Sequence, residues 1–399
     1  MEFAHDDVKY ISTLLPNVRS NKEVTRFFLD LVTMCRESLQ ELQNLNYVVK
    51  ESRALAMSEP IPTGNNYDFI PEKIRKSRFM EFAPHKHIHR ESVKIKHRTY
   101  NFVVIQFTKA PLDPSLLVKQ ACAWLLIASN FAPRQCSKTV DVNLYLTEAK
   151  KVLPTKAQEY VDEAHANTAF TTSCASHTTI NLFRFEEWFK VFIHESFHNL
   201  GLDFSNYPEL CNIANVEILR AFRVNSEVRL YETYCEMWAE IMNVVIRNVA
   251  KHIRMLPENV VKQIEHDLRM ERAFSLFQTI KLLRHFKIKY SDFVNGDVTV
   301  KDKYKERTEV FSYFILKSVL MFNYSKFIEW CMRNNRGSLH FHNPETNILK
   351  YARELILAQY SDPLFLRAIE VVEDAEFSHK KRVHNVHFMH STMRMSAFG

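Results

Sequence analysis

Residues 187–204 read Glu-Trp-Phe-Lys-Val-Phe-Ile-His-Glu-Ser-Phe-His-Asn-Leu-Gly-Leu-Asp-Phe and contain the pattern His-Glu-x-x-His. The segment predicts one continuous helix, in which His194 and His198 lie one turn apart on the same face. Two imidazoles in that arrangement can bind one metal ion, while Glu195 lies about 100° around the helix and can reach a water molecule beside the ion. Gly201 stands where a helix end favours a left-handed residue. The pattern is short enough to arise by coincidence, so its surroundings must support it.

The composition is that of a folded, helix-rich protein. Of the 399 residues, 46% are apolar and 25% are charged, unlike a disordered chain. Five glycines and thirty phenylalanines indicate few tight turns and an aromatic core. The length predicts two or three packed units.

Seven dispersed cysteines, without a Cys-x-x-Cys pair, predict free thiols in a reducing, cytoplasmic compartment. The acidic first residues are not followed by an apolar block and do not resemble a secretory signal. The longest apolar runs, around 121–127 and 311–321, are too short to span a bilayer, so we expect no membrane span.

The net charge is +7, and much of the excess lies in residues 73–98. A basic run of this kind could contact nucleic acid or another polyanion. The alternative is an ordinary solvated face, which is the more common role of such runs.

The order of elements predicts an α+β fold with the sheet ahead of the motif helix. Asn21 caps an amphipathic helix that runs to about Gln43. Strands are expected within 85–108, at 140–147, at 167–172 and at 178–183, with a helix at 114–131. Beyond Pro208 the chain is almost entirely helical, with helices expected at 227–249, 259–285, 307–322, 325–333, 345–359 and 363–373.

Two histidines leave a catalytic zinc one protein ligand short. A third histidine six residues after His198 is excluded, because Phe204 stands there. The helix at 227–249 carries Glu232, Glu236 and Glu240 in consecutive turns of one face. Like charges so placed repel one another, and burial against a cation would reverse that effect. A solvated acidic face is the alternative, but the rest of this helix is largely apolar.

At this point the sequence resembles the gluzincins, the zinc peptidases of the thermolysin type, over residues 165–245. In that family a Glu on a following helix completes the site, and an acid four residues later holds a metal-bound histidine. The resemblance implies one Zn²⁺ per chain bound by His194, His198 and Glu236, with Glu240 as the acid that holds a metal-bound histidine. The alternative assignment makes Glu232 the ligand and Glu236 the acid that holds the histidine.

The same resemblance implies a zincin-like core, a small mixed sheet plus the active-site helix, embedded in a mostly helical chain. We expect an N-terminal helical and basic region at 1–95, the catalytic core at 96–255 and a C-terminal helical subdomain at 256–399. An edge strand at Asn167, Thr168, Ala169 and Phe170 would bind the substrate backbone. No secure counterpart of the family's oxyanion-stabilising residue is found. Tyr313 is one candidate, and Tyr231, Tyr234 and His285 are the alternatives.

These features predict a zinc metallopeptidase in which Glu195 is the general base and a protein or peptide is the substrate. The motif stretch is also similar to zincin-like proteins of large DNA viruses, which implies a virion-associated location as an alternative. The competing hypothesis is a non-catalytic structural or binding protein that keeps the fold and uses residues 73–98 as its partner surface. Retention of Glu195 favours the enzyme, because a structural zinc needs no general base.

Overall fold

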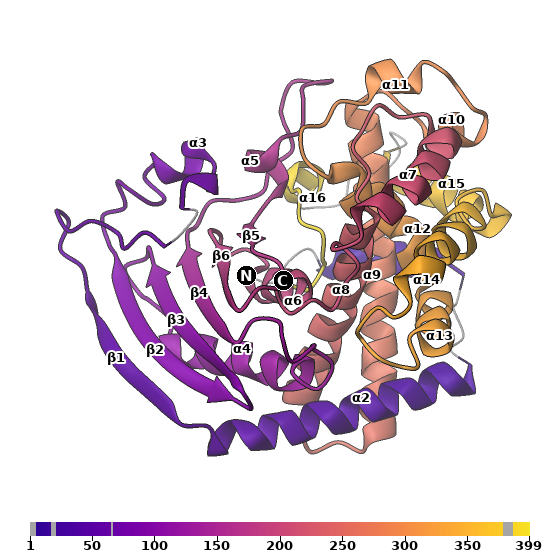
Figure 1. Ribbon diagram of the computed structural model, residues 1–399. Helices are drawn as coiled ribbons and strands as arrows, with labels where there is room; N and C mark the ends of the chain where they lie inside the picture. The colour runs from indigo at the N-terminus through magenta and orange to yellow at the C-terminus, as the bar shows by residue number, and fades with distance from the viewer. Residues whose placement is uncertain (1–4, 17–20, 65–66, 378–385) are drawn as a thin grey trace.

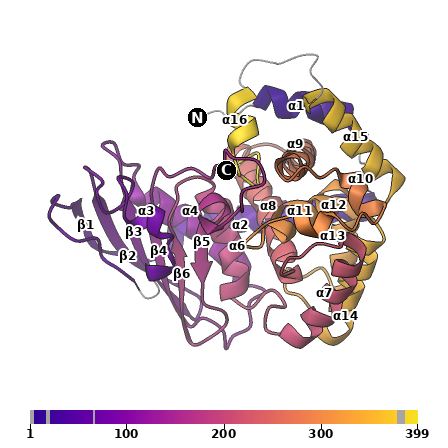
Figure 2. The same ribbon diagram turned by 90° about the horizontal axis from the view of Figure 1, so that it is seen from above.

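The computed structural model describes residues 5–16, 21–64, 67–377 and 386–399. Helices make up 53% of the protein and strands 13%, and the strands form one mixed sheet. The fold is therefore α+β, as the sequence predicts. Figures 1 and 2 show the sheet on one side of the molecule and most of the later helices on the other.

The sheet has six strands in the order β1-β2-β3-β4-β6-β5. Its central pairs β3–β4 and β4–β6 are parallel, and its outer pairs are antiparallel. The strands are β1 (Tyr47–Ala54), β2 (His87–Ile95), β3 (Arg98–Gln106), β4 (Thr139–Leu146), β5 (Ala169–Thr171) and β6 (His177–Leu182). All but β1 agree with the sequence prediction to within a few residues. β1 was not predicted, because its side chains are mostly exposed and lack apolar alternation.

A two-residue turn joins β2 to β3, since Ile95 pairs with Arg98. Lys96 takes the left-handed conformation that such a tight hairpin requires, with φ of 53°. The predicted boundary between regions 1–95 and 96–255 falls inside this hairpin. One hydrophobic core also includes residues from α1 to the last residues of the chain. A second, smaller cluster, which includes Leu55, Ile88 and Phe183, lies apart from it.

The helices that position the sheet are long and mutually packed. The motif helix is α6 (Trp188–Asn199), and it lies between the sheet and α8 (Leu230–Lys251). The buried helix α9 (Pro257–His285) covers the far side of α8. The helix α2 (Lys22–Glu41), capped by the side chain of Asn21, runs beneath both halves of the molecule (Figure 1).

The remaining helical elements are mostly short and surround this frame. They are α1 (His5–Leu14), η1 (Leu42–Asn44), η2 (Tyr67–Phe69), α3 (Glu72–Arg75), α4 (Pro114–Ala128), α5 (Glu163–Ala166), α7 (Pro208–Phe222), α10 (Tyr290–Val294), α11 (Val300–Lys303), η3 (Phe311–Leu316), α12 (Lys317–Phe322), α13 (Tyr324–Asn334), α14 (Pro344–Lys350), η4 (Tyr351–Leu357), α15 (Pro363–Phe377) and α16 (Val386–Ser391). In the described part of the chain, no helix combines the length and apolarity needed to cross a membrane.

The basic run at 73–98 does not form one continuous basic face. Arg98 is fully buried and donates to backbone carbonyls, and Lys86 is also buried. Three further members form ion pairs with nearby acids: Arg75 with Asp68, Lys76 with Glu72, and Arg90 with Glu51. Much of the charge is therefore neutralised locally, which weakens the case for a polyanion surface here.

The cysteine prediction is wrong for one pair. Cys136 and Cys174 form a disulfide, while the other five cysteines are free and buried. The disulfide packs against Gly201, which ends the motif helix with φ of 66°. Spacing alone could not reveal the pair, because the strands between them bring the two residues together. The bond therefore supports the end of α6.

Candidate metal centre

The motif helix is buried on every side. All twelve residues of α6 are buried between the sheet and α8, which explains why the segment is apolar around most of its circumference. The residue before it, Glu187, takes a left-handed conformation with φ of 59°. Left-handed backbone in a residue other than glycine is strained and is often found at functional sites.

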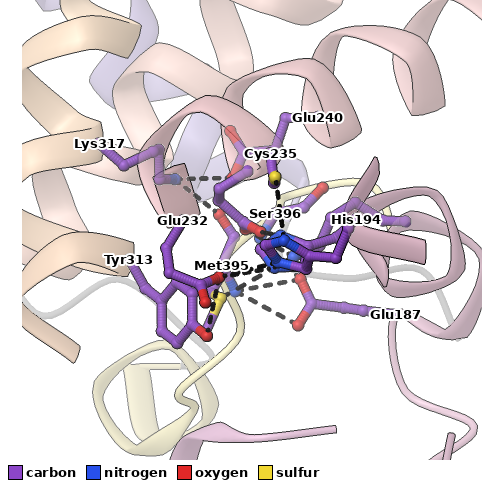
Figure 3. Close-up of polar contacts among 12 residues, drawn as sticks. Glu187, His194, Glu232, Cys235, Glu240, Tyr313, Lys317, Met395 and Ser396 are labelled. Carbon is purple, nitrogen blue, oxygen red and sulfur yellow. Dashed lines mark hydrogen bonds and ion pairs between the residues drawn. The ribbon is translucent and has the colours of Figure 1, made fainter. Parts of the chain in front are cut away.

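Two histidines of α6 and one glutamate of α8 converge on a single point. Nε2 of His194 lies 3.0 Å from Oε2 of Glu232. Nε2 of His198 lies 3.3 Å from the same oxygen and 3.3 Å from Nε2 of His194. All three side chains are buried, and their converging atoms form a group that could hold a metal ion. Figure 3 shows His194 and Glu232 facing each other within this cluster.

The ligand assignment implied by the gluzincin resemblance differs from this geometry by one helical turn. Glu232, expected behind the site, is the carboxylate that meets both histidines. Glu236, expected as the ligand, contacts Nδ1 of His194 at 2.9 Å, on the other side of that ring. The axial position of α8 against α6 decides which carboxylate reaches the histidines. The structure thus corresponds to the alternative assignment.

The second ring nitrogen of each histidine also contacts a carboxylate. Glu236 contacts Nδ1 of His194, and Oδ2 of Asp203 contacts Nδ1 of His198 at 2.5 Å. Such outer carboxylates set the tautomer and the orientation of metal-binding imidazoles. Asp203 was not assigned a role from sequence, although it lies within the motif stretch just beyond Gly201. Its position after the helix end is the signal that could have identified it.

Glu240 does not hold a histidine as the resemblance implies. Its carboxylate pairs with Nζ of Lys317 at 2.7 Å, and Glu236 pairs with Nζ of Lys190 at 2.6 Å. All four side chains are buried. Each carboxylate of the α8 stripe therefore has its own partner. The histidines contact Glu232, Lys190 pairs with Glu236, and Lys317 pairs with Glu240.

The three converging atoms fit a zinc ion. A tetrahedral zinc with ligands at about 2.0–2.1 Å keeps its ligand atoms about 3.3 Å apart, and the observed separations are 3.0, 3.3 and 3.3 Å. Two imidazoles and one carboxylate are also the donor types of catalytic zinc sites. In the absence of a cation, burial would lower the pKa of His194, but hydrogen bonds to Glu232 and Glu236 outweigh it and raise the pKa to about 9. The cluster therefore favours positive charge at its centre.

Glu195 lies beside the cluster without joining it. It lines a small cavity of about 30 Å³ together with His194, Glu236 and Tyr313, which is room for about one water molecule. Burial raises the pKa of the Glu195 carboxyl above its usual value. Among the described residues, its carboxylate oxygens have no hydrogen-bonding partner. This carboxylate is therefore placed to exchange a proton with a molecule in the cavity.

Tyr313 also lines this cavity. Its hydroxyl is 3.3 Å from Oε2 of Glu232, and its ring is 5.9 Å from that of His194. The residue belongs to η3, a π-helical turn, and such widened turns are often found at functional sites. The structure thus places the candidate suggested by the sequence beside the proposed ligands.

The predicted substrate strand divides into two parts. Asn167, Thr168 and Ala169 line the cavity next to His194 and Glu195. Phe170 instead packs against Phe69 at 5.6 Å, away from the cavity. Ala169 and Phe170 are successive residues of β5, so their side chains point to opposite faces of the sheet, whereas Asn167 and Thr168 precede the strand. β5 is an edge strand of the sheet, with β6 as its only neighbour there.

Comparisons of the chain with protein-family models, with curated proteins and with solved structures found no match.

Proposed function

We propose that this protein is a zinc-dependent metallopeptidase with a gluzincin-like core, and that His194, His198 and Glu232 hold the zinc ion. The observation that carries the proposal is the convergence of their three ligand atoms at separations of 3.0–3.3 Å, with Glu195 alongside. The outer carboxylates of Glu236 and Asp203 support it, because they orient both imidazoles.

Zinc held by His194, His198 and Glu232 would supply Lewis-acid chemistry for a water molecule and a carbonyl group. Glu195 would accept a proton from the attacking water and pass it to the leaving amine. The Tyr313 hydroxyl donates a hydrogen bond to the oxygen on which negative charge develops. The free edge of β5 offers backbone groups for an extended substrate.

The second candidate is a non-catalytic protein in which zinc only stabilises the fold. A closed structural site has four protein ligands. In the described part of the chain the group formed by the two histidines contains one further ligand, Glu232. The free carboxylate of Glu195 also has no role in a structural site. Both observations favour the enzyme.

The test measures zinc content and peptide hydrolysis in the full-length protein and in the Glu195→Gln variant. We expect about one zinc per chain in both proteins and hydrolysis of a peptide library in the wild type only. The loss in the variant should be about 10²- to 10⁴-fold, the usual contribution of a general base. Glu209→Gln, at an exposed position of α7, is the matched control and should behave as the wild type.

Three outcomes separate the candidates. A folded wild type that takes up no zinc after reconstitution would contradict both of them. Zinc without hydrolysis of any peptide would favour the structural role. Hydrolysis that survives Glu195→Gln would remove this residue from the mechanism.

A further inference from the structure

The last described segment, residues 392–399, passes beside the candidate centre, with bends at Met395 and Ala397. It contains no helix or strand of its own, yet Thr392 through Phe398 are all buried. The side chain of Met395 lines the same small cavity as His194, Glu195 and Tyr313. Figure 3 shows Met395 and Ser396 beside the cluster.

Buried side chains hold this segment by its main chain. Glu187 accepts from the backbone N–H of Met395 at 3.0 Å and from that of Ser396 at 2.7 Å. Glu271 accepts from the backbone N–H of Ala397 at 2.8 Å. Three successive amides are thus bound by two carboxylates that are themselves buried.

The carbonyl groups are bound in the same way. Lys317 donates to the carbonyl of Met395 at 3.1 Å, and Asn243 donates to that of Phe398 at 2.6 Å. Contacts of this kind bind main-chain groups and therefore depend little on the side-chain sequence of the segment.

The segment is connected to the metal centre by shared residues. Lys317 also pairs with Glu240, and Lys190 contacts both Glu236 and the sulfur of Met395. Glu187, whose carboxylate binds two of the amides, is the strained residue that precedes the motif helix. The same side chains therefore hold the segment and the helices that carry the proposed ligands.

The groove continues beyond the segment. Ala397 and Phe398 border a second cavity of about 670 Å³, which also reaches Lys190 and Asn243. This volume lies within the usual range of ligand sites. The segment therefore separates a small cavity at the metal centre from a larger one open to a ligand.

We propose that residues 392–399 occupy the peptide-binding groove of this centre as an internal ligand, and that a peptide substrate binds there after the segment leaves. The proposal rests on the proposed peptidase function for its biological meaning, but the groove itself is tested by binding alone. The ligand class is a peptide that is recognised mainly through its main-chain groups, with a flexible apolar side chain at the position of Met395.

The test keeps every residue of the chain. A protease cleavage sequence is inserted between residues 380 and 381, and the folded protein is cut there. A fluorescent peptide with the sequence of residues 391–399 is then added. We expect it to exchange into the cut protein and to bind the uncut protein at least tenfold more weakly. A scrambled peptide should not bind.

The recognition contacts are tested in the cut protein. Glu271→Gln should weaken binding of the peptide about tenfold, because a carboxylate that accepts two hydrogen bonds is lost. Glu258→Gln, at an exposed position of the same helix, should have no effect. Equal binding to both variants and the wild type would overturn the assignment of Glu271 as a recognition residue.

Hydrogen exchange of the intact protein provides a second readout. We expect the amides of 395–397 to exchange at least tenfold faster than those of α8 and α9, because the segment must open without global unfolding. Exchange as slow as that of α8, or no peptide exchange in the cut protein, would make the segment part of the permanent core and overturn the proposal. Peptide exchange in a protein that neither binds zinc nor hydrolyses peptides would support the peptide-binding groove and contradict only the proposed peptidase function.

Discussion

Oε2 of Glu236 lies 2.9 Å from Nδ1 of His194 and therefore faces the side of the imidazole that points away from His198. Glu232, one turn earlier on α8, faces the other nitrogen of the same ring at 3.0 Å. One helix thus supplies both the carboxylate that completes the centre and the carboxylate that orients its first histidine.

This arrangement predicts different effects of the two glutamates on metal affinity. Glu232→Ala should abolish stoichiometric zinc binding, because it removes one of three ligands. Glu236→Gln should weaken binding by about 10- to 100-fold, the usual effect of an outer partner. Affinity can be measured by competition with a chromophoric chelator, with Glu258→Gln as the control. Zinc retained in Glu232→Ala but lost in Glu236→Ala would restore the assignment made from the family resemblance.

Tyr313→Phe should lower kcat of peptide hydrolysis by about 100-fold, the typical cost of losing one donor to the developing oxyanion. Zinc content should not change, because the phenol is not a ligand. The measurement is steady-state kinetics together with elemental analysis. Tyr160→Phe, at an exposed position, is the control. An unchanged kcat would exclude the role.

Burial raises the pKa of Glu240 well above its usual value even beside Lys317, so the carboxyl can take up a proton when this partner is removed. Lys317→Met should therefore destabilise the protein by about 1–3 kcal/mol, the cost of a buried polar group that loses its partner. The double variant Lys317→Met/Glu240→Leu should recover much of this loss, since no buried polar group is then left unpaired. Urea unfolding measures both changes. Lys326→Met, at an exposed position of α13, should change the free energy of unfolding little. A double variant no more stable than Lys317→Met would show that the pair is not the source of the loss.

The Cys136–Cys174 disulfide closes a loop between residues 38 positions apart. Loop-closure entropy predicts that replacing both cysteines by serine lowers the free energy of unfolding by up to about 4 kcal/mol. A reductant should lower the melting temperature of the wild type and leave that of the double variant unchanged. Identical melting of the wild type with and without reductant would show that the bond does not stabilise the fold.

Because of Glu187, the free energy of unfolding should fall as the pH is lowered into the acid range. Burial alone would raise the pKa of its carboxyl, but Lys151, Lys190 and Arg394 outweigh it and lower the pKa to about 2. A carboxyl whose pKa is lowered by folding contributes stability above its unfolded pKa near 4.5, and this contribution is lost as the pH falls towards 2. The shift corresponds to about 3 kcal/mol.

Urea unfolding at several pH values between 7 and 2.5 tests this expectation. In Glu187→Gln the protein should be less stable at neutral pH, and its stability should fall less steeply below pH 4.5. The control Glu258→Gln should follow the wild type. Parallel pH profiles for Glu187→Gln and the wild type would refute the assignment.

The local pattern of the sequence was sufficient to predict the main helices and strands near the candidate centre. The strand at 140–147 followed from alternation, and the continuous helix predicted for the motif segment placed His194 and His198 on one face. The stripe of carboxylates on α8 was also visible, because helical periodicity places these residues on one face. These features depend on neighbours a few residues apart, and the sequence by itself determined them.

The sequence could not decide whether Glu232 or Glu236 meets both histidines. Moving α8 by one turn, about 5.4 Å, presents the next carboxylate on the same face, so periodicity cannot distinguish the two. The packing of α8 against α6 and α9 fixes that position. Lys190 and Lys317 then neutralise the two carboxylates that do not meet both histidines.

Contacts between distant parts of the chain decided the rest. Strand β1 is held by its pairing with β2, the disulfide joins Cys136 to Cys174, and residues 392–399 bind to Glu187 and Glu271. None of these contacts leaves a periodic signal, because each depends on segments that only the folded core brings together. The sequence therefore determined the motif helix and the residue types on its faces, and the tertiary structure decided which carboxylate of α8 meets both histidines and which segment lies beside them.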